Sequence, residues 1–324
     1  MSKNFLKYYI IIGLSLIICG AVIFYYSLPG FPKYSAKQDL AMWNVPDIDT
    51  VQSTSEAALL RYGRDLIINT ARWLGPKGSI AHISNGMNCE NCHLDAGTRP
   101  DGNCFAMVTS TYPKFRERSG RKESVEFRVN DCMERSLNGE KLDSLSKEMR
   151  AMVAYIVWLG KDVPKGIKMK GMGIPDIPLM QRAASIGNGE KVFAAKCTSC
   201  HAANGAGLFN ADSSAYFYPP LWGEHSYNVS AGIYRLSRLA GYIKYNMPFM
   251  KEPAGPQLSD EEAWDVAAYI NSQLRPQKMF ASDWPKITSK PFDYPFGPFA
   301  DSFPALQHKY GPFDVIKKQM KKDK

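Results

Sequence analysis

One five-residue pattern occurs twice in this chain of 324 residues and constrains its fold more than any other feature. Residues 89–93 and 197–201 both read C-x-x-C-H. This spacing is typical of covalent attachment of a c-type haem, because two thiols must reach one porphyrin while the next residue offers an imidazole to the iron. A zinc half-site could explain one copy, but two copies, each followed by a helical pattern, indicate two covalently bound haems. The predicted attachment residues are Cys89, Cys92, Cys197 and Cys200, and the predicted proximal iron ligands are His93 and His201.

Helical patterns surround each motif in the same order. A helix is expected over residues 55–74, after a possible capping box at Ser53 and Glu56, and a closing helix over 145–159. The second half repeats this plan with helices over 182–196 and 259–274, separated by a long irregular stretch after His201. Both closing helices contain Ala-Tyr-Ile. We therefore predict a mainly α fold with two tandem class I cytochrome c domains, at 53–160 and 181–275, joined by a Gly- and Pro-bearing linker at 161–180.

The two ends of the chain differ in character from these domains. Residues 5–26 are almost wholly apolar, with Lys3 and Lys7 at the front, which predicts a membrane-spanning helix within an anchor segment at 1–28, with a cleaved signal peptide as the alternative. A connector at 29–52 follows. Both alternatives place the remaining chain in the periplasm, and the first tethers it to the inner membrane. Residues 276–324 form a Pro- and aromatic-rich C-terminal extension, which we expect to pack over the surface.

Charge favours a small partner. The formal net charge is +9, but the folded region holds no long run of lysine or arginine. A basic balance of this kind attracts anions in general. We therefore expect a small anionic substrate and no nucleic acid.

The distal iron ligands decide between electron transfer and catalysis. For the second haem we predict Met247, which precedes a proline, with Met250 in reserve. The first domain has no Met-Pro pair, and Cys132 stands at the corresponding position. Three interpretations of Cys132 stay open: a disulfide with Cys104, an inert buried thiol, or an iron ligand, for which Met133 is the fallback.

Several basic residues surround Cys132 in the sequence. Part of this group can pair with haem propionates or lie in solvent. The rest can form a cationic pocket for a multiply charged oxyanion, since guanidinium donors match such oxygens in planar pairs. Together with a thiolate and an iron, such a pocket suggests sulfur chemistry. The group consists of Lys114, Arg116, Arg118, Arg121, Arg128 and Arg135, with Ser136 directly after it.

Six segments together resemble the dihaem thiosulfate dehydrogenases, some of which also act as tetrathionate reductases. They are NCHL (91–94), YP-x-FR-x-RSG (112–120), RVN-x-C-x-ERS-x-NG (128–139), EM-x-AM-x-AYI (148–156), NMP (246–248) and QHKYGPF (307–313). The resemblance implies that Cys132 is the distal ligand of the first, catalytic haem. It also implies that Arg118, Arg128 and Ser136 line its substrate pocket and that Met247 serves the second haem. Some members carry a competing lysine directly before this methionine, where this chain has Asn246.

The reaction that this resemblance implies joins two thiosulfates into tetrathionate and releases two electrons, which leave through the His/Met haem to a cytochrome c or a membrane redox protein. A membrane-anchored dihaem electron carrier without catalytic activity of its own is the main alternative. Thiosulfate or tetrathionate should perturb the haem spectrum of the enzyme and leave that of a plain carrier unchanged.

Overall fold

The computed structural model describes residues 42–250 and 255–322. The expected anchor at 1–28 and most of the connector lie outside these ranges. Within them, no helix is long and apolar enough to cross a bilayer.

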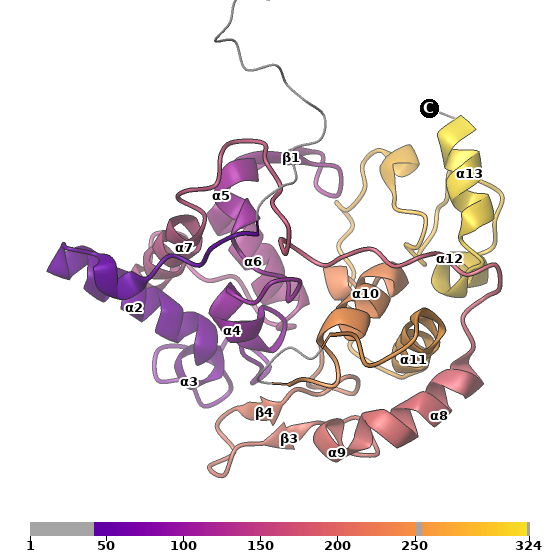
Figure 1. The fold of residues 1–324 in the computed structure, drawn as a ribbon, viewed down its shortest axis with the longest axis horizontal. Coiled ribbons are helices and arrows are strands. Elements are labelled where there is room, and N and C mark those ends of the chain that lie inside the picture. Colours follow the sequence, from indigo (N-terminus) through magenta and orange to yellow (C-terminus); the bar gives the residue numbers. More distant parts are fainter. Residues whose placement is uncertain (1–41, 251–254, 323–324) are drawn as a thin grey trace, which may run out of the picture. The chain divides into compact units, whose positions relative to one another are not determined.

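The described chain is mainly helical, as predicted, with two short antiparallel hairpins (Figure 1). The helices of the first half are α2 (Thr54–Ile68), α3 (Thr70–Leu74), α4 (Leu94–Gly97), α5 (Met107–Thr111), α6 (Val125–Arg135) and α7 (Lys147–Leu159). The second half contains α8 (Ile186–Lys196), α9 (Thr198–His201), α10 (Leu236–Asn246) and α11 (Asp260–Ser272). The C-terminal extension adds α12 (Ala305–Tyr310) and α13 (Asp314–Lys322).

Short elements complete each half. Strands β1 (Lys114–Arg116) and β2 (Arg121–Glu123) pair with Phe115 opposite Lys122, and β3 (Leu208–Phe209) pairs with β4 (Tyr216–Tyr218). Single 3₁₀ turns lie at Ile48–Thr50, Cys89–Asn91, Gly232–Tyr234 and Ile287–Ser289. The first hairpin leads directly into α6, so it places the chain around Arg118 beside that helix.

Serine side chains begin the four predicted helices. Ser53 accepts a hydrogen bond from the Glu56 backbone at 3.3 Å, and Ser259 and Glu262 form a complete capping box. Ser185 caps α8, so this helix begins later than the predicted residue 182. The helix predicted over 55–74 is interrupted at Asn69, because the backbone of Ala71 donates to the distant Asn88 side chain (2.8 Å).

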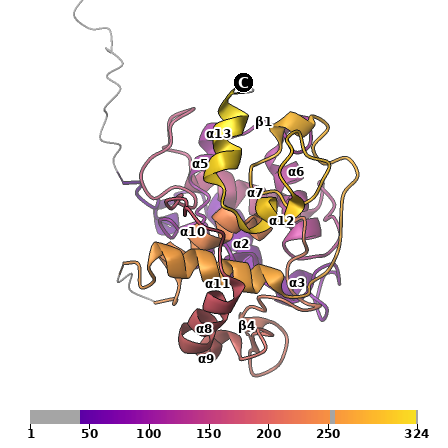
Figure 2. The ribbon, with the colours of Figure 1, turned by 90° about the vertical axis from the view of Figure 1, so that its right-hand side faces the viewer.

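The same helix crossing occurs in both halves. A Cβ atom on Gly63 of α2 would lie 2.0 Å from the Ala151 carbonyl oxygen of α7. A Cβ atom on Gly189 of α8 would lie 1.9 Å from the Asp265 carbonyl oxygen of α11. Only glycine permits such close backbone contact. Figure 2 shows α8 crossing beneath α11. The repeated crossing supports the interpretation of two copies of one domain.

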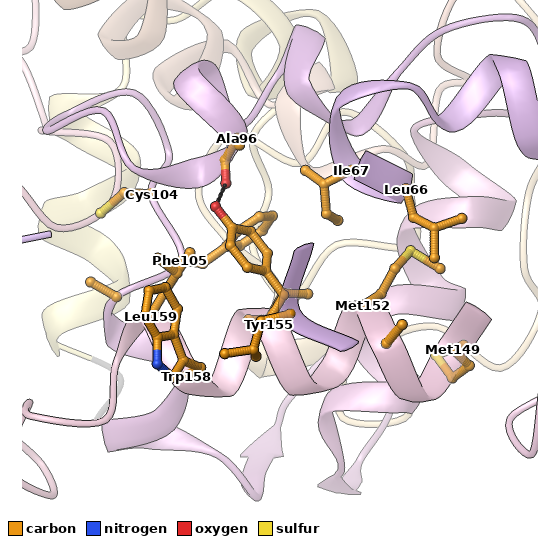
Figure 3. Packing of buried hydrophobic residues seen from close by; sticks show 14 of the residues in the cluster. Leu66, Ile67, Ala96, Cys104, Phe105, Met149, Met152, Tyr155, Trp158 and Leu159 are labelled. Atoms are coloured by element: carbon orange, nitrogen blue, oxygen red, sulfur yellow. Dashed lines mark hydrogen bonds between the residues drawn. The ribbon is translucent and has the colours of Figure 1, made fainter. Parts of the chain in front are cut away.

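The core of the first half forms between α2 and α7 (Figure 3). Leu66 of α2 and Met152 of α7 are fully buried there. Burial of each side chain stabilises the folded state by about 2 kcal/mol. The Tyr155 hydroxyl donates to the Ala96 carbonyl (3.1 Å), the bond drawn in Figure 3. The closing helix therefore holds the loop that follows the first C-x-x-C-H motif.

Two helices depart from the expected pattern. The stretch after His201 is not irregular throughout, because it contains α10, and α6 forms where no helix was predicted. The C-terminal extension is also more ordered than its composition suggested. Its Ile316 is fully buried, and its Phe313 packs on Trp264 of α11 with ring centroids 5.6 Å apart. The extension thus contributes to the second core.

Candidate active site

The second C-x-x-C-H motif follows directly on α8, whose C-cap is Cys197. His201 is buried and donates from Nδ1 to the Pro219 carbonyl at 2.9 Å. Burial lowers the pKa of His201, so the imidazole is neutral near pH 7. Because the carbonyl fixes the proton on Nδ1, Nε2 is the nitrogen that is free to bind a metal.

A cavity of about 520 Å³ lies beside this histidine. Cys197, Cys200 and His201 line it on one side, and Met247 contributes to its wall after the end of α10. Apolar side chains complete it, among them Leu239, Ile243, Leu258, Val266 and Ile270. Met250, the reserve ligand, is 45% exposed, and its carbonyl accepts from Arg99 at 2.6 Å. The fold therefore brings Met247, rather than Met250, to the cavity of His201.

The first motif holds its histidine in a similar way. His93 Nδ1 lies 2.6 Å from the Asn103 carbonyl oxygen, while Nε2 is 3.5 Å from the Asn103 side-chain nitrogen. The imidazole stacks on Phe105 at 4.2 Å, and Gly97 leaves room for that ring, since a Cβ atom would lie 2.0 Å from it. Burial lowers the pKa of His93 to about 4, which keeps it in the neutral form that binds iron.

Helix α6 brings Cys132 to the first motif. Burial, with a smaller effect of the nearby Cys132 sulfur, raises the pKa values of the Cys92 and Cys89 thiols to about 12 and about 11. The neighbouring residue Met133, the fallback ligand, is packed in the core of the first half and is 1% exposed. All six described cysteines are free, so the disulfide alternative for Cys132 is not formed; Cys104 is buried and donates to the Gly171 carbonyl (3.4 Å).

The same helix carries most of the predicted pocket. Arg128, Cys132 and Ser136 are spaced four residues apart, so they lie along one face. Ser136 is the C-cap, and its backbone N–H donates to the Cys132 carbonyl at 2.8 Å. The Cys132 sulfur is the largest influence on Arg128 and raises its pKa. The predicted residues of α6 are thus brought together.

Asp131, which was not among the predicted site residues, organises the arginines. Its Oδ2 accepts from Arg128 Nη1, and its Oδ1 accepts from Arg135 Nε. Burial alone would raise the pKa of Asp131, but Arg128, Arg135 and Arg118 outweigh that effect and hold it below its usual value. Asp283 then binds Arg135 from the other side with two hydrogen bonds of 2.7 and 2.8 Å. The spacing of Arg128, Asp131 and Arg135 was the signal in the sequence.

Arg118 approaches the same carboxylate from the turn between β1 and β2. Its Nη1 lies 4.0 Å from Asp131 Oδ2 and donates to the Ser230 carbonyl at 3.1 Å. The residue is 8% exposed, and burial lowers the pKa of its guanidinium to about 10. Among the described residues, Arg118 Nε has no hydrogen-bond partner. A buried donor of this kind suits an anion that arrives from outside.

Not every predicted basic residue joins this group. Lys114 and Arg121 are exposed, and Arg121 lies over the Phe127 ring at 4.1 Å. Arg116 faces Glu123 at 3.9 Å. In contrast, the Tyr112 hydroxyl is buried without a hydrogen-bond partner in the described ranges, and Arg128 and Arg116 lower its pKa against the larger effect of burial. Arg118, Arg128 and Arg135 therefore form the arginine cluster proper.

The two motifs lie close together. The Tyr242 hydroxyl, on α10, donates to the Asn91 carbonyl inside the first motif at 3.1 Å. Asn91 and Cys92 also line the cavity that contains Cys200 and His201. Groups bound at the two motifs would therefore be neighbours, which favours electron transfer between them.

These residues fit two covalently bound haems. Each half offers two cysteines, a neutral histidine with Nε2 as its ligand atom, and a sulfur side chain, Cys132 or Met247, near the same motif. The cavity beside the second motif is lined largely by apolar side chains, as a porphyrin requires. Fold and site together define a dihaem c-type cytochrome.

Comparisons with known proteins narrow this class. The profile described as "SoxA/TsdA, cytochrome c domain" matches residues 79–164, and the profile described as "Cytochrome c" matches residues 186–273. A thiosulfate dehydrogenase of Psychrobacter arcticus is 37% identical over 74% of this chain and 71% of its own length. One from Allochromatium vinosum is 38% identical over 68% of this chain and 83% of its own length. The chain belongs to the thiosulfate dehydrogenase family, as its sequence suggested.

A solved structure supports the same assignment. The thiosulfate dehydrogenase TsdBA of Marichromatium purpuratum, in its as-isolated form, matches with a TM-score of 0.67 and 31% identity over 73% of this chain. This chain spans half of the length of that protein. The predictions of two cytochrome c domains, two covalent c-type haems and an oxidoreductase are thereby confirmed.

Proposed function

We propose that this protein oxidises thiosulfate and that it interconverts thiosulfate and tetrathionate. In the oxidative direction the outer sulfurs of two thiosulfates form one S–S bond, and two electrons leave. The observation that carries the proposal is the position of Cys132 on α6, beside both cysteines of the first motif and one helical turn from Arg128. The names of its relatives supply the substrate.

The arginine cluster addresses the largest electrostatic difficulty of this reaction. Two dianions held about 5 Å apart repel each other by about 3 kcal/mol in water, and by more in a buried pocket. Within the described ranges, Arg118, Arg128 and Arg135 form ion pairs with two carboxylates, Asp131 and Asp283, so the guanidinium groups of the cluster outnumber these carboxylates by one. We assign Arg118 and Arg128 to the two anions and Ser136 to a hydrogen bond with one of them.

Cys132 has two roles in this proposal. At rest its sulfur would hold the iron of the first haem together with His93, and the side chain would be released for chemistry when substrate enters. The thiolate then joins the outer sulfur of one thiosulfate as two electrons leave. The outer sulfur of a second thiosulfate attacks that same sulfur, which forms tetrathionate and releases the Cys132 thiolate. The two haems supply one-electron acceptors, one for each electron released.

The remaining roles concern electron exit. We assign His201 and Met247 as ligands of the second haem, because both line one cavity. Such a ligand pair raises the reduction potential of a haem, which suits a site that receives electrons. From there the electrons pass to a cytochrome c or a membrane redox protein. The apolar segment at 5–26, outside the described residues, tethers the protein to the inner membrane on its periplasmic side in this proposal, with signal cleavage as the alternative.

Electron paramagnetic resonance of the oxidised protein, beside a Cys132→Met variant, tests the ligand assignment. We expect a low-spin thiolate-type signal that disappears in the variant. Cys132→Gly should lose turnover of thiosulfate while both haems remain attached. Full turnover in Cys132→Gly would refute the cysteine mechanism. Two His/Met signals, together with a haem spectrum that neither thiosulfate nor tetrathionate perturbs, would favour the electron carrier instead.

A further inference from the structure

The C-terminal extension reaches the end of α6 that carries the arginine cluster. Lys278 Nζ donates to the Gly139 carbonyl at 2.7 Å, just beyond that helix. The Phe280 ring lies 3.9 Å from the Arg135 guanidinium, and Asp283 binds the same guanidinium with both oxygens. The side chains of Arg135 and Asp283 are each only 8% exposed. The extension therefore makes a buried contact with the catalytic half of the chain.

The next residue of the extension holds Arg118. The Trp284 backbone N–H donates to the Arg118 carbonyl at 2.6 Å, and the Trp284 ring lies 5.6 Å from the Arg118 guanidinium. Pro285 packs against Gly120 in the same turn, where a Cβ atom would lie 2.5 Å from the proline ring and φ is +65°. Backbone and side chain of Arg118 are thus both fixed by residues 284–285.

Few other groups fix this guanidinium. Asp131 is 4.0 Å away, too far for a hydrogen bond, and the Ser230 carbonyl takes only Nη1. The aromatic face of Trp284 can hold the cation without occupying its N–H groups. Arg118 Nε consequently stays available while the side chain is held in place.

Asp283 has a comparable effect through Arg135. Because Asp283 takes both terminal nitrogens of Arg135, only Nε of that arginine reaches Asp131. The second oxygen of Asp131 is therefore left for Arg128. Without Asp283, the terminal nitrogens of Arg135 would turn to Asp131 and compete with Arg128.

We propose that the C-terminal extension is part of the substrate site, with Trp284 and Asp283 as positioning residues for Arg118 and Arg128. The inference rests on the proposed function and extends it: the dianion is held by arginines whose orientation is set by residues outside both cytochrome c domains. Neither residue needs to touch the substrate.

Trp284→Leu tests this proposal without changing any charge. We measure kcat and KM for thiosulfate with ferricyanide as acceptor, and we titrate the oxidised protein with tetrathionate, following the haem absorbance. Loss of the aromatic face should weaken the binding of both anions, so that the KM for thiosulfate and the Kd for tetrathionate each rise roughly tenfold. The kcat should stay within about threefold of the wild-type value. Trp284→Phe, which keeps a ring, should restore most of the affinity. Trp73→Leu is the matched control, because Trp73 lies 5.2 Å from Arg72, which is outside the cluster.

Asp283→Glu provides an independent variant. It keeps the charge but adds a methylene, which pushes Arg135 towards Asp131, so KM should again rise several-fold. Anion affinities that match the wild type in both folded variants would overturn the inference while the wild type still oxidises thiosulfate. A wild type that neither oxidises thiosulfate nor binds tetrathionate would overturn the proposed function and this inference with it.

Discussion

Asp131→Asn should destabilise the protein strongly, although it changes only one atom of the side chain. Asp131 is 8% exposed and accepts from Arg128 and Arg135, with Arg118 at 4.0 Å. The substitution leaves three guanidinium groups with Asp283 as their one carboxylate in the cluster. Removing one partner of a buried ion pair costs about 3–5 kcal/mol. For a chain of this size that corresponds to a fall in Tm of roughly 10 °C.

The loss should also depend on pH in a defined direction. The arginines hold the pKa of Asp131 below its usual value in the folded state. Its contribution is therefore complete above the unfolded pKa of about 3.9 and disappears as the pH falls through the lower folded value. The difference in Tm between wild type and variant should stay constant from pH 7 to about pH 5 and become smaller below about pH 4.

Thermal unfolding followed by far-ultraviolet circular dichroism measures both effects. Asp49→Asn is the control, since Asp49 binds Arg61 at 2.7 Å but both side chains are more than half exposed. Such a pair contributes about 0–1 kcal/mol, so the control should shift Tm by no more than about 3 °C. A Tm of Asp131→Asn within 2–3 °C of the wild type, or a difference that grows in acid, would refute the reasoning about the arginine cluster.

Two further predictions concern the helices. Gly189→Ala should lower the free energy of unfolding by about 1–3 kcal/mol, because its Cβ atom would overlap the Asp265 carbonyl. Gly187→Ala, in the same helix, places its Cβ atom in open space and should be neutral or slightly stabilising. Denaturant unfolding of both variants measures this difference. Tyr62→Phe should remove a loss of stability that the wild type suffers at alkaline pH. Burial and a 2.8 Å hydrogen bond to Glu148 raise the pKa of Tyr62 to about 12. The wild type therefore loses stability as the pH rises above about 10, where the tyrosine of the unfolded chain ionises. The variant's difference in Tm from the wild type should therefore narrow above about pH 10, and an unchanged difference would contradict this.

The haem-attachment motifs and the N-termini of the capped helices could be predicted well from the sequence. The two C-x-x-C-H motifs depend on a fixed spacing within five residues, so no tertiary information was needed. Ser53 and Ser259 begin α2 and α11 because a serine oxygen satisfies a backbone N–H three residues later. Both features are determined by a few neighbouring residues, so they can be predicted without knowledge of tertiary contacts.

Helix α10 shows where local signals fail. Its buried positions Leu236, Leu239, Ala240 and Ile243 follow a helical spacing, yet Arg235 at its N-cap makes no side-chain cap. The cap comes from the C-terminal extension instead, where Asp293 accepts from the backbone N–H of Ser237 at 3.0 Å. A helix whose first turn is satisfied by such a distant residue cannot be recognised from its own flanks.

The arrangement of the arginine cluster likewise cannot be recognised from the local sequence, and this matters for the predicted site. Arg118, Arg128 and Ser136 were recognised in the sequence because they fall in motifs of one family. Which basic residues share a carboxylate depends instead on Asp131 and on Asp283, which lies far away in the sequence. Asp283 and Trp284 belong to the C-terminal extension, and they contact Arg135 and Arg118 from there. The arrangement of the arginine cluster therefore depends on a segment outside both cytochrome c domains, which the family's cysteine and histidine spacing does not reveal.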